Sequence, residues 1–142
     1  MQEYTLGQFI SENAIMCGVF AALIVILVVT EIQMRTRRFS DVKPADAVKL
    51  MNHSNAVVLD VRSVKDYQAG HIINAINVPL EQLANEIKKL GKNKEKPIIT
   101  YCRSGNTSQR ACKELEKEGF TAIHNLRGGI AAWERDGLPL SK

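Results

Sequence analysis

The chain has 142 residues, a length that ordinarily forms one domain. Its net charge of +4 is not arranged as a basic stripe with interleaved aromatic side chains, so nucleic-acid binding is not expected. The three cysteines show no CxxC spacing and no cluster with histidines, so we expect no zinc site, no other metal and no cofactor.

The first recognisable element is an uncharged apolar segment at residues 14–30. As a helix rising 1.5 Å per residue it would be about 25 Å long, a little short of the ~30 Å hydrocarbon core, and apolar residues just beyond it could extend it. A buried core helix usually has a polar stripe, and a cleaved signal peptide has basic residues before its apolar run. This segment has neither feature. We therefore expect a transmembrane helix at 14–34 after an N-terminal tail at 1–13.

Basic residues follow this segment closely, and none precede it; they are Arg35, Arg37, Arg38 and Lys43. The positive-inside rule then predicts a single-pass protein of the inner (cytoplasmic) membrane, with its N-terminus outside and its C-terminal domain in the cytoplasm. Much of the net positive charge comes from this basic cluster, and attraction to anionic lipid headgroups explains the cluster better than nucleic-acid binding does. Residues 35–43 are expected to form a basic juxtamembrane linker.

Short apolar runs and helix-like segments alternate along the rest of the chain. The expected strands are 56–59, 75–78, 98–101 and 122–126, and the expected helices are 44–52, 64–69, 80–90, 108–118 and 130–135. The first of these runs is continuously apolar, as in a strand buried on both faces of a parallel sheet. This alternation predicts an α/β domain at 44–142, with a central, mainly parallel sheet flanked by helices.

The stretch YCRSGNTSQRAC, residues 101–112, places Cys102 directly after an expected strand and before an expected helix. Ligands bind at such strand ends in open α/β sheets. Gly105 and Asn106 tolerate positive φ, so the loop amides can curl inward and, with the helix N-terminus, stabilise an anion. A cysteine in that setting has a pKa of roughly 3.5–7.5 and is a nucleophile as its thiolate. The alternative is a buried thiol that packs at the end of a core strand.

Three segments carry a resemblance to a known family; they are LDVRSVKDYQAGHIINAINVPL (59–80), YCRSGNTS (101–108) and NLRGGIAAWERDGLPL (125–140). In this order and at this spacing they closely resemble a single-domain rhodanese, a sulfurtransferase. With the apolar segment before it, the chain resembles the small membrane-anchored rhodanese-like proteins of bacteria.

The resemblance implies a rhodanese-like domain whose Cys102 takes sulfane sulfur from a donor such as thiosulfate. Cys102 would hold that sulfur as a persulfide and pass it to cyanide or a thiol. The resemblance implies a small sulfur donor and a thiol acceptor as partners. The apolar segment adds the lipid bilayer at 14–34, and a tethered domain could serve a membrane-protein client. No general base is required, so His71 is expected to be structural.

The residues beside Cys102 are the candidate substrate-binding groups; they are Arg103, Ser104, Gly105, Asn106, Thr107, Arg62 and Asp60. Arg103 could hold a thiosulfate oxygen or lie in solvent. By the resemblance, the segment with Asp60 and Arg62 borders the active site. Arg62 could pair with Asp60 and brace the loop, or attract an anionic donor.

Thr107 departs from the family pattern, because many bacterial relatives carry a basic residue there. It could cap the following helix, but it offers no positive charge to an anionic donor. This puts thiosulfate in doubt relative to a protein or small-molecule persulfide. Arg110 could partly substitute for the missing charge or lie on the surface. Cys112 is expected in the core, with resolution of a persulfide as the alternative.

Two rival functions remain open from the sequence. Cysteine phosphatases hold phosphate with an arginine placed six positions after the cysteine, where this chain has Ser108. The second rival is a membrane-tethered persulfide-binding or scaffold module with little turnover. Replacing Cys102 with serine separates the scaffold from the sulfur carrier, because a scaffold keeps its cellular effect and a sulfur carrier loses it.

Overall fold

The computed structural model describes residues 5–35, 38–90 and 94–142. Its backbone contacts divide the chain into two compact units, Met1–Arg37 and Arg38–Lys142. The expected tail and linker are therefore described only in part, because residues 1–4 and 36–37, including Arg37 of the basic cluster, lie outside the described ranges.

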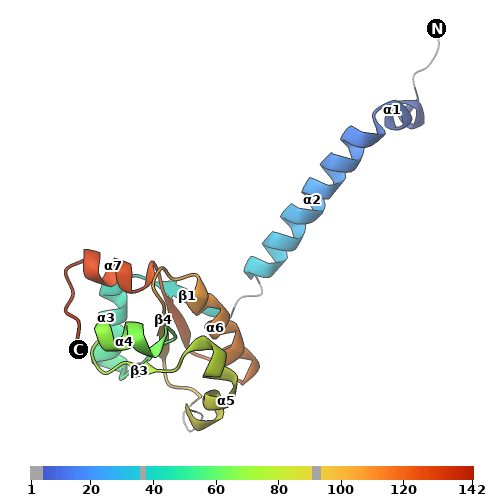
Figure 1. Ribbon diagram of the computed structural model, residues 1–142. Helices are drawn as coiled ribbons and strands as arrows, with labels where there is room; N and C mark the ends of the chain where they lie inside the picture. Colours follow the sequence, from blue (N-terminus) through green and yellow to red (C-terminus); the bar gives the residue numbers. More distant parts are fainter. Residues whose placement is uncertain (1–4, 36–37, 91–93) are drawn as a thin grey trace. The chain divides into compact units, whose positions relative to one another are not determined.

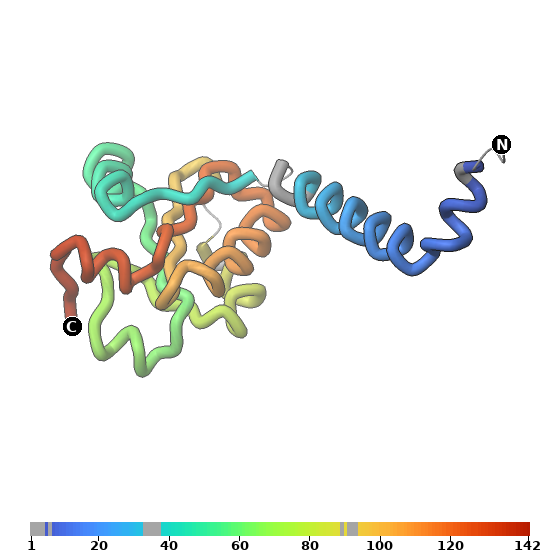
Figure 2. The backbone as a smooth tube through the Cα atoms, turned by 90° about the horizontal axis from the view of Figure 1, so that it is seen from above, coloured from blue at the N-terminus to red at the C-terminus, as the bar shows by residue number. Residues whose placement is uncertain are grey.

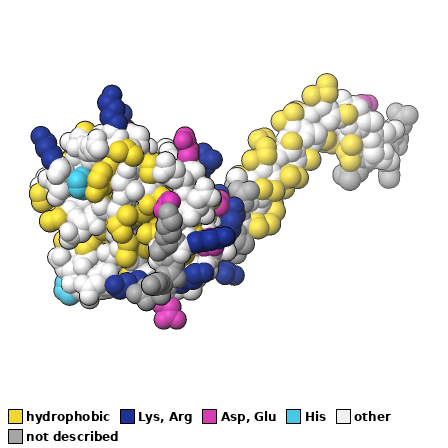
Figure 3. Space-filling model, turned by 60° about the horizontal axis from the view of Figure 1, so that its bottom comes forward, with side chains coloured by type: hydrophobic (Ala, Val, Ile, Leu, Met, Phe, Trp, Pro, Cys, Tyr) yellow, Lys and Arg dark blue, Asp and Glu magenta, His cyan; other side chains and the backbone are white. Residues whose placement is uncertain are grey.

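The first unit consists of helices α1 (Leu6–Glu12) and α2 (Ala14–Arg35). Helix α1 lies in the expected tail and begins at a capping box, in which the side chains of Thr5 and Gln8 each bind the other's backbone amide. Helix α2 coincides with the expected span. Its segment Ala14–Ile32 has a mean hydropathy of 2.7, is not buried, and is long and apolar enough to cross a membrane. In Figure 3, hydrophobic side chains run along this helix.

The second unit is built on one five-stranded sheet of order β1-β5-β4-β2-β3, in which every pairing of the five strands is parallel. The strands are β1 (Phe39–Val42), β2 (Val57–Asp60), β3 (Ile76–Asn77), β4 (Ile98–Tyr101) and β5 (Ile123–Leu126). The helices are α3 (Pro44–Ser54), α4 (Val64–Ala69), α5 (Leu80–Leu90), α6 (Thr107–Lys117) and α7 (Gly129–Arg135) (Figure 1). The prediction of a parallel α/β domain flanked by helices is confirmed.

Alternate residues of the central strands supply two separate cores, one on each face of the sheet. Leu59 and Ile98 pack with side chains of α5 and α6. Val58 and Ile99, their neighbours in the chain, pack with side chains of α3, α4 and α7. Successive strand residues point to opposite faces, so a continuous apolar run is what a sheet covered on both sides requires.

Residues 39–42 form the edge strand β1 and not a linker, so the prediction of a linker at 35–43 is wrong for them. They pair with β5, from Phe39 beside Ile123 to Val42 beside Leu126. Phe39 is buried in the core on the α5–α6 face. The segment has apolar residues only at its two ends, Phe39 and Val42, so it lacks the alternation that predicts a strand from the sequence.

The sheet order brings the ends of β2 and β4 together. Asp60 lies beside Tyr101 in the register of these strands. The residues that follow each strand therefore meet at the carboxyl edge of the sheet, the edge at which open α/β sheets bind ligands.

On the side of α4, His71 pairs with Ser141 in an isolated antiparallel bridge, which brings the C-terminal segment beside the segment that follows α4 (Figure 2).

Candidate active site

Cys102 follows β4, and its side chain points into the loop that leads to α6. The Sγ atom accepts hydrogen bonds from the amides of Gly105 at 3.1 Å and Ser108 at 3.3 Å, and the Oγ atom of Ser108 lies 3.4 Å away. Gly105 has a φ of +91°, a conformation that glycine adopts without strain. The amide cradle expected from the sequence is therefore present around the sulfur.

Two opposing effects act on the pKa of Cys102. Burial raises it, because the thiolate loses its hydration. Hydrogen bonds from the amides of Ser108, Ser104 and Gly105 lower it, and the Ser108 hydroxyl would lower it further when its proton faces the sulfur. The hydrogen bonds prevail, and the pKa of Cys102 lies below its ordinary value. Thiolate is the nucleophilic form of cysteine, so this site favours nucleophilic attack by sulfur.

The loop amides can face the sulfur because the loop carbonyls are bound from the other side by α7. The Cys102 carbonyl accepts from the amide of Ile130 at 2.9 Å, and the Arg103 carbonyl accepts from the amide of Ala131 at 3.2 Å. Gly129 makes this approach possible: an added Cβ there would lie 2.4 Å from the Cys102 carbonyl oxygen. The sequence indicated only a turn at Gly128 and Gly129, although the paired glycines were the available signal.

A chain of polar side chains lies behind the cradle; Ser108 and Asn125 are buried, and Asp41 at its far end is exposed. The Ser108 hydroxyl donates to Asn125 Oδ1 at 2.6 Å. Asn125 Nδ2 donates to Asp41 Oδ1 at 2.7 Å and to the Gly105 carbonyl at 3.2 Å. Sequence reasoning assigned no role to Asn125 or Asp41, and nothing in their local sequence distinguishes them from ordinary strand residues.

Arg62 is held by Asp60. Its Nε atom lies 3.0 and 3.1 Å from the two Asp60 carboxylate oxygens, and its Nη2 atom donates to Asp60 Oδ2 at 2.7 Å and to the Gly70 carbonyl at 2.8 Å. Asp60 is fully buried, and 11% of the Arg62 side chain is exposed. This geometry supports the bracing role over attraction of a donor, because two of the three guanidinium nitrogens are engaged within the fold.

A pocket of about 620 Å³ opens in front of Cys102. Its charged and polar lining includes Arg62, Asp66, Glu81, Arg103, Thr107 and Arg110. Among the residues that the structure describes, no side-chain hydrogen bond or ion pair engages Arg103 or Arg110. Two cationic groups are thus available to an anion that enters the pocket.

The remaining candidate residues contribute in different ways. Ser104 and Asn106 are exposed, and Ser104 acts on the sulfur through its amide. Thr107 lines the pocket but is the first residue of α6, so it does not cap that helix as expected; the N-cap is Asn106, which makes no side-chain capping bond. In the described ranges, no group of three His, Cys, Asp or Glu side chains could hold a metal ion.

Cys112 lies in a different environment on α6. It is fully buried, and its Sγ atom lies 2.9 Å from Thr100 Oγ1. Burial raises its pKa to about 12. It is a free cysteine and does not line the pocket in front of Cys102, so the structure supports a packing role.

The fold and the loop have counterparts among known proteins. The profile of the rhodanese-like domain family matches residues 43–136. The uncharacterized protein YibN of Escherichia coli is 36% identical over 141 residues, which cover 99% of this chain and 97% of that protein. A sulfurtransferase from Allochromatium vinosum is 33% identical over 92 residues, covering 65% of this chain and 84% of its own.

A solved structure shows the same architecture. The crystal structure of a rhodanese-related protein from Thermoplasma volcanium superposes with a TM-score of 0.65 at 30% identity, covering 72% of this chain and 97% of that one. The family match at residues 43–136 contains strands β2 to β5, the cradle around Cys102 and the glycine pair that supports it. The chain therefore belongs to the rhodanese-like domain family.

Proposed function

We propose that this protein is a sulfurtransferase that carries sulfane sulfur as a persulfide on Cys102. The observation that carries the proposal is the contact of the Cys102 Sγ atom with the amides of Gly105 and Ser108, at 3.1 and 3.3 Å. These donors stabilise negative charge on sulfur without a general base, and both the attacking thiolate and the resulting persulfide carry that charge. The name of the Allochromatium relative supports the same activity.

The reaction with thiosulfate would proceed in two displacements. The Cys102 thiolate attacks the outer sulfur of thiosulfate, the sulfur–sulfur bond of thiosulfate breaks, and sulfite leaves with its electron pair. In the second displacement, cyanide or a thiolate attacks the outer sulfur of the Cys102 persulfide, and the Cys102 thiolate leaves. No external oxidant or reductant is consumed in either displacement, so the chain needs only a donor and an acceptor.

The charges of the pocket support an anionic donor. Thr107 supplies no positive charge, but Arg103 and Arg110 line the same pocket as Cys102. We assign to Arg110 the attraction that a basic residue at position 107 would provide. The volume of about 620 Å³ falls within the range of small-molecule sites and exceeds what thiosulfate alone would fill, which leaves room for a larger organic thiol as acceptor.

The α2 helix is proposed to anchor the domain to the membrane. A core helix would be buried, whereas none of the Ala14–Ile32 segment is buried in the structure. The alignment with YibN extends over 99% of this chain, so that relative matches the apolar segment together with the domain. The basic residues after α2 favour the orientation with the domain in the cytoplasm, where Cys102 stays reduced.

The test is the intact mass of the full chain in detergent after incubation with thiosulfate. The expected result is a gain of about 32 Da that cyanide removes, with no gain in Cys102→Ser. The matched control is Cys112→Ser, which should gain the same mass because Cys112 does not line the pocket.

Two negative results have distinct meanings. If thiosulfate fails but an inorganic polysulfide adds sulfur to Cys102, the thiosulfate assignment is wrong and the persulfide assignment stands. If a folded sample gains no sulfur from either donor, the sulfurtransferase proposal is wrong and the scaffold reading replaces it.

A further inference from the structure

The polar side chains behind the cradle form a continuous path from the edge strand to the sulfur. The path runs from Asp41 on β1 to Asn125 on β5, and from Asn125 to Ser108 on α6, whose Oγ atom lies 3.4 Å from the Cys102 sulfur. Ser108 is 0% exposed and Asn125 is 1% exposed. Water therefore does not compete for Ser108 and Asn125, and their hydrogen bonds decide one another's orientation; Asp41, at the start of the path, is exposed.

The orientation of the Asn125 amide follows from its neighbours. Its Nδ2 atom lies 2.7 Å from a carboxylate oxygen of Asp41 and 3.2 Å from the carbonyl of Gly105, and both of these atoms can only accept. The reversed amide would place its oxygen against two acceptors. The Oδ1 atom of Asn125 therefore faces Ser108, as an acceptor.

Ser108 has one hydroxyl proton and two neighbours that could receive it. Asn125 Oδ1 lies at 2.6 Å and the Cys102 sulfur at 3.4 Å. If the proton turned to the sulfur, Asn125 Oδ1 would face a buried oxygen without a donor, and such an unsatisfied group costs about 1–3 kcal/mol. The Ser108 oxygen then presents a lone pair to the sulfur, which suits a protonated thiol better than a thiolate.

We propose that Asn125 is a positioning residue that withholds the Ser108 proton from Cys102, so that the backbone amides alone stabilise the negative sulfur. The inference rests on the proposed function, since it concerns the same nucleophile. Its chemical consequence is a limit on how far the thiol is acidified. The nucleophilicity of a thiolate falls as its pKa falls, and attack is fastest when the pKa lies near the ambient pH. Asp41 is the residue of β1 that holds Asn125 in this role.

The test is the pKa of Cys102, measured on the full chain in detergent from the pH dependence of iodoacetamide labelling. Arg103 and Arg110 lie between Cys102 and Cys112, so trypsin places the two thiols on separate peptides that mass spectrometry quantifies independently. No sulfur donor is involved, so the outcome is independent of whether the protein transfers sulfur. The charged groups of the pocket stay unchanged in every variant; they are Arg62, Asp66, Glu81, Arg103 and Arg110.

Ser108→Ala and Asn125→Ala should change the pKa of Cys102 in the opposite direction to the one expected if the Ser108 hydroxyl donated to the sulfur. Ser108→Ala should leave the pKa of Cys102 unchanged or lower it, because the variant removes an acceptor of the thiol proton. Asn125→Ala should lower the pKa by about one unit, because Ser108 is then free to donate to the thiolate. A rise of about one unit in Ser108→Ala, or any rise in folded Asn125→Ala, overturns the proposal. If one variant does not fold, the other still decides.

Ser40→Ala is the matched control. Ser40 pairs with His124 one position before the Asp41–Asn125 pair, and its Oγ atom lies 2.8 Å from His124 Nδ1. The variant removes a side-chain hydrogen bond between the same two strands without touching the path to the sulfur. It should leave the pKa of Cys102 unchanged. An equal shift in the Ser40 and Asn125 variants would mean that loosening of β1 causes both shifts, and it would overturn the positioning role of Asn125.

Discussion

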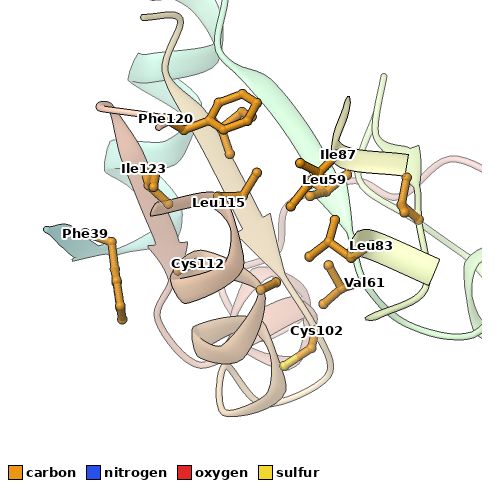
Figure 4. Packing of buried hydrophobic residues seen from close by; sticks show 13 residues of the cluster. Phe39, Leu59, Val61, Leu83, Ile87, Cys102, Cys112, Leu115, Phe120 and Ile123 are labelled. Atoms are coloured by element: carbon orange, nitrogen blue, oxygen red, sulfur yellow. The ribbon is translucent and has the colours of Figure 1, made fainter. Parts of the chain in front are cut away.

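Cys102 and Cys112 belong to the same hydrophobic core, yet their sulfur atoms have opposite acid–base behaviour. Cys102 is 4% exposed and Cys112 is 0% exposed, so burial alone does not distinguish them. The pKa of Cys102 is lowered, whereas that of Cys112 is raised to about 12. Figure 4 shows Cys102 at the end of the cluster, at the turn into α6, and Cys112 within the helix that follows.

The difference lies in which backbone amides are available to each sulfur. Around Cys102 the chain turns from a strand into a helix, and the amides of Gly105 and Ser108 have sulfur as their acceptor. The amides of the first helical turn have no carbonyl partner in the helix, so they can donate to a ligand or a side chain. Cys112 lies inside α6, and its side-chain partner is the hydroxyl of Thr100. Burial makes a thiol inert unless a break in regular structure supplies donors.

The labelling rates of the two thiols test this contrast most directly. At neutral pH, iodoacetamide should label Cys102 at least ~1,000 times faster than Cys112 in the folded full chain, because only thiolate reacts. With a pKa of about 12, Cys112 would be ionised to on the order of 10⁻⁵ at pH 7. The Cys102 rate should rise with pH and reach half of its plateau at a lower pH than that of a free thiol, because the pKa of Cys102 is lowered. Equal rates for the two peptides would contradict the contrast.

Gly129→Ala should disrupt the cradle while Cys102 is retained. The new Cβ would lie 2.4 Å from the Cys102 carbonyl oxygen and 2.6 Å from the Arg103 carbonyl carbon. The loop must shift, so persulfide formation from thiosulfate should fall by at least ~100-fold. Gly137→Ala is the control, since its φ of +73° is also positive but no atom lies within 4 Å of the added Cβ. Equal losses of activity in the two variants would mean that backbone strain, and not the contact with the loop, is responsible.

Arg62→Lys should lower stability, because an ammonium group cannot reproduce the fork that binds Asp60 and the Gly70 carbonyl. The expected loss is about 2 kcal/mol in the free energy of unfolding. Urea unfolding of the full chain, followed by the fluorescence of its single tryptophan, Trp133, measures it. Lys49→Ala, which breaks an exposed pair with Asp46, should cost under ~0.5 kcal/mol. A stable Arg62→Lys protein with weakened donor binding would instead give Arg62 a substrate role.

Arg110→Gln should have the smallest effect and should act on the donor alone. Removing one cation from the pocket should raise the thiosulfate concentration for half-maximal persulfide formation by about threefold, and 1 M salt should reduce the difference. The control is Arg135→Gln, since Arg135 is exposed on α7 and does not line the pocket. An unchanged thiosulfate dependence would remove Arg110 from donor attraction.

Much of the domain could be predicted from its sequence because the signals are local. The helices at 64–69 and 80–90 and the strand at 98–101 have the predicted bounds, since their apolar spacing and end residues are contained within each segment. Strand β1 was missed because four residues become a strand only through pairing with β5, which is more than 80 residues away in the chain. Helix α1 was missed because its capping box was not recognised within the polar tail.

The sequence by itself determined that Cys102 follows a buried strand, that small loop residues surround it, and that an apolar helix precedes the domain. These features depend on neighbouring residues and on the periods of strand and helix. Only the tertiary structure decided which groups hold the loop. Gly129, Asn125 and Asp41 reach it because the sheet order β1-β5-β4 brings the ends of three strands together. Long-range pairing supplies those contacts; the paired glycines indicate a turn, and no local pattern encodes the roles of Asn125 and Asp41.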